Sequence, residues 1–152
     1  MKRSGLMSAV VLCLTAFAST AHAHHSHPYF YDACRNVSIE GRVESVEFKD
    51  PHTLIHLRLD DGAAYIVEWG GLRGLTIAGV MGPAKESLVP GARVAVTGNP
   101  IRTGAEIREH FPEFKGDPNP NILDPYSIRR VGDTFTWALP PRTSLMSCGG
   151  GK

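Results

Sequence analysis

The residues of this chain whose types and spacing could do chemistry are histidines near its amino end. Imidazole nitrogens, together with an α-amine and a deprotonated backbone amide, suit the tetragonal coordination of Cu(II). A histidine-rich arm can equally be a solvated segment that binds nothing. On composition and spacing we predict a Cu(II) or Zn(II) site, to which the later histidine contributes if the arm folds back. The predicted ligands are His24, His25, His27 and His52.

The segment before these histidines has the three parts of a secretory signal peptide. Basic residues at positions 2 and 3 are followed by an apolar run from residue 6 to residue 17 and then by Ala21-His22-Ala23. The run is shorter than the roughly 20 residues that cross a bilayer. We therefore expect residues 1–23 to be removed on export to the bacterial periplasm or beyond, with no transmembrane segment left in the mature chain.

The cleavage position decides what the new amino end can bind. A cut after Ala23 makes His24 the first residue, so that its amine and its ring can bind one metal together, or the amine, amide and ring of His25 can do so instead. A cut after Ala21 places His24 third, which is also an arrangement that binds copper and nickel. Both positions remain open, and both leave an end capable of binding copper.

The mature chain has the size and charge of one nearly neutral domain. Cleavage after Ala23 takes 23 of the 152 residues and leaves 129, which fits a single domain. It also takes two of the 16 basic residues, leaving 14 against 15 acidic ones. Without a basic field to attract a phosphate backbone, no nucleic-acid partner is expected.

Two cysteines remain after cleavage, Cys34 and Cys148. Exported proteins meet an oxidising compartment, in which such a pair can form a disulfide. It would join the start of the domain to its tail. The alternative is two unrelated cysteines, because the sequence does not show whether they come within bonding distance.

The middle of the chain alternates between apolar and polar residues, which predicts strands. Within residues 37–48 the alternation changes phase, and a β-bulge at Glu44-Ser45 would produce that change. Asp60-Asp61-Gly62 is typical of a hairpin turn. Further strands are expected at 55–59, 65–69 and 94–98, with a last strand or hairpin at 128–137. A short helix at 72–79 is expected between the third and fourth strands.

This order of elements predicts an all-β fold, a small five-stranded OB-like barrel with one short helix. A small β-sandwich is the alternative architecture. We expect a flexible His-rich arm at 24–36, a barrel domain at 37–139 with a long loop at 103–126, and a flexible tail at 140–152. The loop is predicted from its polar residues and its four prolines.

The sequence contains no pattern that assigns a catalytic residue. A Gly-x-Ser-x-Gly elbow, a calcium loop and a phosphate-binding loop are all absent from it. Tyr65 and Trp69 share one side of a predicted strand, which is more typical of a core than of a ligand-binding face. His56 and His110 are expected to be an outward strand residue and a solvated loop residue. These observations favour a binding protein over an enzyme.

Several of these segments resemble a family of small exported bacterial proteins of unknown function. The resemblance covers roughly residues 24–102, departing at Asp50, where Asn is more usual, at Asn99, where His is common, and in the 103–126 insertion. It implies a compact β domain behind a His-His-Ser amino terminus, and it implies no activity. It rests on His24-His25-Ser26, the strand at 37–43, Asp50-Pro51-His52, Glu68-Trp69 and the run at 88–100.

Two principal functions therefore follow from the sequence. The first is a periplasmic metal-binding module that holds copper through its mature amino-terminal histidines. The alternative is an OB-type module that binds a protein, peptide or saccharide partner in the cell envelope. A copper oxygenase ranks last, because a small barrel with a mobile arm gives no sign of a rigid, substrate-matched site.

Overall fold

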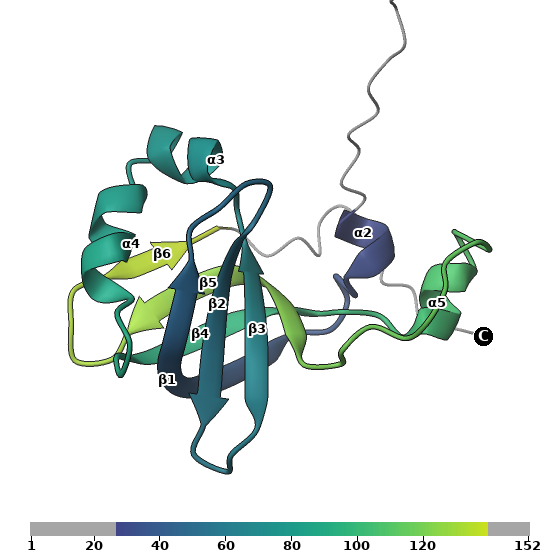
Figure 1. Cartoon of the computed structure of the whole chain (residues 1–152), viewed down its shortest axis with the longest axis horizontal. Helices are drawn as coiled ribbons and strands as arrows, with labels where there is room; N and C mark the ends of the chain where they lie inside the picture. Colours follow the sequence, from purple (N-terminus) through teal and green to yellow (C-terminus); the bar gives the residue numbers. More distant parts are fainter. Residues whose placement is uncertain (1–26, 140–152) are drawn as a thin grey trace, which may run out of the picture.

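The computed structural model describes residues 27–139, which form a β-barrel with short helices at its margins (Figure 1). Five strands build the barrel, and a sixth extends the sheet beyond it. The strands are β1 (Val37–Glu47), β2 (Thr53–Leu59), β3 (Ala64–Trp69), β4 (Arg93–Pro100), β5 (Ile122–Arg130) and β6 (Thr136–Ala138). The helices are α2 (His27–Phe30), α3 (Leu72–Ile77), α4 (Met81–Ser87) and α5 (Gly104–Arg108).

The barrel is closed by a parallel pairing between β3 and β5, at Ile66 with Ile122 and at Val67 with Leu123. All other neighbours pair antiparallel, in the order β3-β2-β1-β4-β5. This closed circuit, with helices between β3 and β4, is the OB-type arrangement. The predicted five-stranded barrel is thus confirmed, and the sandwich alternative is wrong.

A bulge in β1 allows one strand to serve two sides of the barrel. The register with β2 shifts between Val43 and Ser45, so Glu44 is the extra residue, as the change of phase in the sequence predicted. Extra residues of this kind bend a strand and increase its twist. The hairpin between β2 and β3 is also confirmed, with Gly62 at φ +89°.

Apolar residues from every barrel strand fill the interior. Leu75 of α3 and Ala84 of α4 join them from one end of the barrel. Burial of such side chains contributes about 1.5–3 kcal/mol each for the larger ones. The most completely buried apolar side chains of the barrel strands are Ile55, Leu57, Val67, Val94 and Ile128.

The expectation of one short helix was incomplete. The predicted helix is α3, but α4 follows it, although Gly82 and Pro83 weaken helix propensity. Proline is tolerated in the first turn, where its missing N–H would have no helical acceptor.

The long loop predicted at 103–126 includes regular structure. This segment contains α5 and the first residues of β5. Thr103 and Glu106 form a capping box at the start of α5, in which Glu106 N–H donates to Thr103 Oγ1 at 3.3 Å and Thr103 N–H donates to Glu106 Oε2 at 2.7 Å. The Thr-x-x-Glu pattern was readable in the sequence.

The described part of the arm, residues 27–36, packs against the rest of the chain, whereas a flexible segment was predicted across 24–36. α2 lies beside α5, away from α4 (Figure 1). Phe30 stacks on Phe111 with ring centroids 5.5 Å apart and meets the edge of Phe114 at 6.0 Å. Tyr31 then forms a bridge with Ile101 next to β4. The 103–121 insertion therefore holds the arm in place. The predicted signal peptide and the predicted tail at 140–152 lie outside the described residues.

Gly71, just before α3, provides a test of how the turn before β2 is held. A Cβ there would come within 2.5 Å of the Pro51 carbonyl oxygen, whereas a Cβ at Gly74 would meet no heavy atom within 4 Å. We expect Gly71→Ala to lower the free energy of unfolding by about 1–3 kcal/mol through overpacking. Gly74→Ala should leave it unchanged or raise it, because alanine favours a helix. Urea denaturation of both variants measures the difference, and equal stabilities would contradict the close packing of this turn.

Candidate functional site

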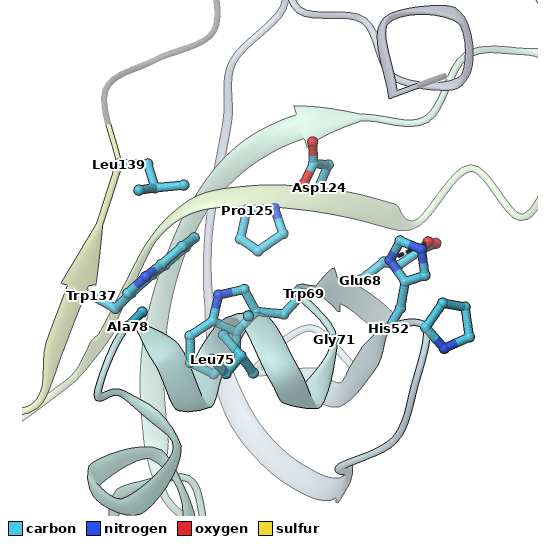
Figure 2. A pocket seen from close by; sticks show the side chains of 13 residues that line it. His52, Glu68, Trp69, Gly71, Leu75, Ala78, Asp124, Pro125, Trp137 and Leu139 are labelled. Carbon is cyan, nitrogen blue, oxygen red and sulfur yellow. Dashed lines mark ion pairs between the residues drawn. The ribbon is translucent and has the colours of Figure 1, made fainter. Parts of the chain in front are cut away.

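A pocket of about 350 Å³ opens between α3, the end of β3 and the strands β5 and β6 (Figure 2). It lies where the closing β3–β5 pairing stops. Val67 and Leu123 are the last paired residues, and the next two residues of each strand, Glu68-Trp69 and Asp124-Pro125, line the pocket. Small residues of α3, among them Gly74, leave room on the opposite side. The pocket is therefore a product of barrel closure.

His52 lies at the rim of this pocket, immediately before β2. It follows the cis Asp50–Pro51 peptide bond, and Asp50 Oδ1 accepts a hydrogen bond from Leu72 N–H at 2.9 Å. The two atoms His52 Nδ1 and Glu68 Oε1 are 3.0 Å apart, and the side chains are only 16% and 27% exposed (Figure 2). Since an ionised carboxylate only accepts, Nδ1–H is the donor and the ring is held in one orientation.

Glu68 also receives a hydrogen bond from the arm. The hydroxyl group of Tyr31 donates to Glu68 Oε2 at 2.6 Å. Burial, that hydrogen bond and the negative charges of Glu68 and Asp124 together raise the pKa of the Tyr31 phenol well above its ordinary value. Tyr31 therefore remains a neutral donor at physiological pH. The chain of contacts from Tyr31 through Glu68 to His52 links the arm to the pocket rim.

The inner wall of the pocket is aromatic. Trp69 and Trp137 meet edge to face, with ring centroids 5.1 Å apart and an interplanar angle of 66°. Trp69 is only 2% exposed, and its buried Nε1–H finds no hydrogen-bond acceptor among residues 27–139. This nitrogen faces the space near Trp137 and Pro125 (Figure 2). A buried donor without an acceptor costs about 1–3 kcal/mol, so the wall is arranged at some cost to stability.

The predicted metal ligands have different outcomes. His24 and His25 lie outside the described residues, and His27 is the first residue of α2. Only His52 is placed in the pocket. Within residues 27–139, no group of three or more His, Cys, Asp and Glu side chains could hold a metal ion.

The remaining predicted residues lie elsewhere. Cys34 follows α2, and its backbone N–H donates to Asp32 Oδ1 at 3.1 Å; Cys148 lies outside the described residues, so their pairing stays a prediction. His56 points outward and lies 2.8 Å from Glu47 Oε1, as expected for an outward strand residue. His110 packs on the ring of Tyr29, with centroids 4.8 Å apart.

Several residues of the pocket were not predicted as site residues. Trp69 was interpreted as core, and it is buried as expected, but it also lines the pocket. The Glu68-Trp69 pair was already among the residues that carry the family resemblance, and this resemblance was the sequence signal that could have marked the pair as part of a site. Asp124, which lines the pocket, and Tyr31, which contacts Glu68 from the arm, had no such signal, because the first lies in the predicted loop and the second in the predicted arm.

The fold and this pocket together define an OB-type barrel with a lined pocket at the point of closure, an architecture consistent with a binding module. The chain belongs to the Family of unknown function (DUF6152), whose model matches residues 10–108. This confirms the resemblance found in the sequence. No helix within residues 27–139 has both the length and the apolar character needed to cross a membrane.

Comparison with other proteins adds little about activity. No curated protein matches the chain. One similar solved structure is titled a crystal structure of the S. pombe Stn1-Ten1 complex, with 16% sequence identity and a TM-score of 0.44. The match covers 65% of this chain and 60% of the other.

The raised pKa of Tyr31 gives a test of the arm-to-pocket contact. In the unfolded chain Tyr31 ionises near pH 10, but in the folded chain it stays protonated. The stabilising contribution of its neutral form is therefore complete below pH 10 and declines as the pH rises above that value. We expect Tyr31→Phe to lower the free energy of unfolding by about 1–3 kcal/mol at pH 8, and the difference from wild type to narrow at pH 11.

Tyr65→Phe is the matched control, because it removes a phenol hydroxyl from β3 outside the pocket. Urea denaturation of wild type and both variants at both pH values measures the six free energies of unfolding. A gap between wild type and Tyr31→Phe that stays constant from pH 8 to pH 11 would contradict the buried, protonated phenol.

Proposed function

We propose that this protein is an exported metal-binding module that holds Cu(II), or else Zn(II), at the mouth of the pocket. The ligands are His52 and the mature amino-terminal residues His24 and His25, with His27 close behind them in sequence. The observation that carries the proposal is the hydrogen-bonded chain Tyr31–Glu68–His52. It places an oriented imidazole beside the point where the arm meets the barrel.

The His52–Glu68 pair has the form of a metal ligand with its supporting carboxylate. Histidines that bind metals usually donate the N–H of their other ring nitrogen to a carboxylate or carbonyl, which fixes the tautomer and raises the basicity of the ligand. Here Nδ1–H points to Glu68 at 3.0 Å, so Nε2 carries the lone pair that would bind the metal. Tyr31 in turn holds Glu68 in position.

We expect the arm histidines to reach this imidazole. Arg102 N–H donates to the Phe30 carbonyl at 2.8 Å, and Asp32 N–H donates to the Pro100 carbonyl at 2.9 Å, so the arm is fixed on both sides of Tyr31. Only Ser26 separates His25 from α2. An extended residue spans about 3.5 Å, so each residue before α2 lengthens the reach of the arm by that amount.

A metal at this position needs ligands from two parts of the chain, which supports a module that closes on its metal. Residues 27–139 alone lack a group of three suitable side chains. The α-amine of His24 and the arm imidazoles complete a nitrogen-rich set of the kind that Cu(II) prefers over oxygen ligands.

Replacement of His52 tests the proposal with an internal control. We expect His52→Ala to weaken Cu(II) binding by tenfold or more, because it removes one ligand. Glu68→Gln should weaken it by roughly 10–100-fold, as loss of a supporting carboxylate does. His56→Ala is the control, since His56 also pairs with a carboxylate, Glu47 at 2.8 Å, but on the outside of β2. Competition titrations with a Cu(II) chelator, using mature protein that begins at His24, measure the affinities.

Equal affinities of the His52→Ala and His56→Ala variants would exclude His52 as a ligand. Tight binding that survives the double change of His24 and His25 to alanine would exclude the amino terminus. Either result would overturn the shared site.

Native mass spectrometry of the exported protein, purified without added metal or an amino-terminal tag, tests the remaining parts. We expect a chain that begins at His24 or His22, a loss of two protons if Cys34 and Cys148 pair, and one retained copper or zinc ion. Replacement of His24 and His25 should remove the metal and leave the rest of the mass unchanged. A metal-free wild-type chain would contradict a resident metal.

A second candidate is an OB-type module that binds an organic partner. The aromatic wall of the pocket, with the buried Nε1–H of Trp69, favours this function independently of the metal.

A further inference from the structure

We infer that the aromatic end of the pocket is a binding site for one ring of a neutral saccharide. The inference rests on the second candidate function, not on the metal. Its starting point is the indole N–H of Trp69, which is buried, faces the pocket and has no acceptor among the described residues. A buried donor in such a place is satisfied by a ligand that brings an acceptor oxygen.

The side chains that line the pocket determine which apolar surface the ligand must have. Trp69, Trp137, Leu75 and Leu139 present carbon surfaces around the space. Saccharide rings have C–H faces that pack on such surfaces, while their hydroxyl groups both donate and accept hydrogen bonds. A hydrocarbon ligand would leave the Trp69 N–H unpaired, so a purely apolar occupant does not fit.

The charges of the pocket exclude other classes of ligand. Glu68 and Asp124 contribute two carboxylates to the lining, which includes no Lys or Arg among the described residues. Anions such as phosphates and acidic sugars are therefore repelled. A cation would be attracted by the carboxylates, but it has no acceptor to offer the Trp69 N–H, which would stay unpaired. A neutral hydroxyl group can pair with both kinds of group. Its oxygen can accept from the Trp69 N–H, and its O–H can donate to a carboxylate, which has about four lone-pair positions and can accept it beside its other partners.

Size and backbone chemistry favour one sugar ring over a peptide. A volume of about 350 Å³ is near the lower end for ligand pockets. A peptide that adds as a strand needs backbone donors and acceptors along the wall, but Pro125 has no N–H to offer.

Binding in the pocket can be followed by intrinsic tryptophan fluorescence. The chain has two tryptophans, Trp69 and Trp137, and both line the pocket. We propose titrating the full mature chain with glucose, galactose, mannose and N-acetylglucosamine at millimolar concentrations while following tryptophan fluorescence. Saturation-transfer NMR confirms which sugar protons approach the protein. EDTA in the buffer removes any contribution from a metal, so failure here is distinct from failure of the metal site.

Two glycines provide a matched pair of variants. Gly74 of α3 lines the pocket and Gly82 of α4 does not, and a Cβ at either position would meet no heavy atom within 4 Å. We expect a saturable fluorescence change with at least one sugar in wild type and in Gly82→Leu. Gly74→Leu should lose it, because the leucine side chain fills the pocket.

Trp69→Phe tests the hydrogen bond without depending on the glycine variants. It keeps an aromatic wall and removes the N–H, so sugar affinity measured by NMR should fall about three- to tenfold. The melting temperature of the free protein should also fall, because the smaller ring leaves part of the core unfilled. A merely structural role for Trp69 would lower the melting temperature in the same way but leave the affinity for the sugar unchanged.

Three results would overturn the inference. A response that persists in Gly74→Leu would place the sugar elsewhere. Binding of trialanine, with no response to any sugar, would preserve the binding module but replace the saccharide with a peptide. No saturable response to sugars or peptide would remove both the saccharide and the organic-binding function, and would leave the metal proposal to its own titrations.

Discussion

The parallel pairing between β3 and β5 is the contact on which the rest of the structure depends. Only Ile66 with Ile122 and Val67 with Leu123 form it, yet it converts an open sheet into a closed barrel. Closure encloses the apolar faces of all five strands in one core. It also brings Glu68-Trp69 of one strand beside Asp124-Pro125 of another, although more than 50 residues separate them. The pocket opens where this short pairing ends.

Polar groups around the pocket are held by contacts from segments outside the barrel. Glu68 is half-buried and accepts hydrogen bonds from Tyr31 in the arm and from His52 before β2. Burial of a charged carboxylate is unfavourable unless such donors replace water. The arm therefore contributes to the electrostatics of the pocket as well as to its shape. The aromatic contacts of Phe30 with Phe111 and Phe114 explain how the insertion stabilises this position of the arm.

The two proposed binding activities use different ends of one pocket. At the rim, the imidazole of His52 lies beside Glu68, which Tyr31 of the arm also contacts. At the inner end, two indoles and a buried N–H line the pocket. Because the rim and the inner end belong to one pocket, the two proposals place a metal and an organic ligand side by side in the same OB-type barrel. Gly74, which leaves the pocket open, and Gly71, which allows α3 to approach the turn before β2, are the backbone features on which this arrangement rests.

The sequence by itself determined the features that arise from nearby residues. The change of phase in β1 located the bulge at Glu44, and Asp61-Gly62 located the hairpin, because turn chemistry and side-chain alternation are local properties. That hairpin register pairs Thr53 with Trp69. Because His52 and Glu68 are the residues before these two, their nearness could also have been predicted from the sequence. The tertiary structure alone decided that Tyr31 and Asp124 join them. Both depend on contacts between distant segments, the bridge of Tyr31 to Ile101 and the closure of β5 on β3, and such contacts leave no periodic trace in the chain.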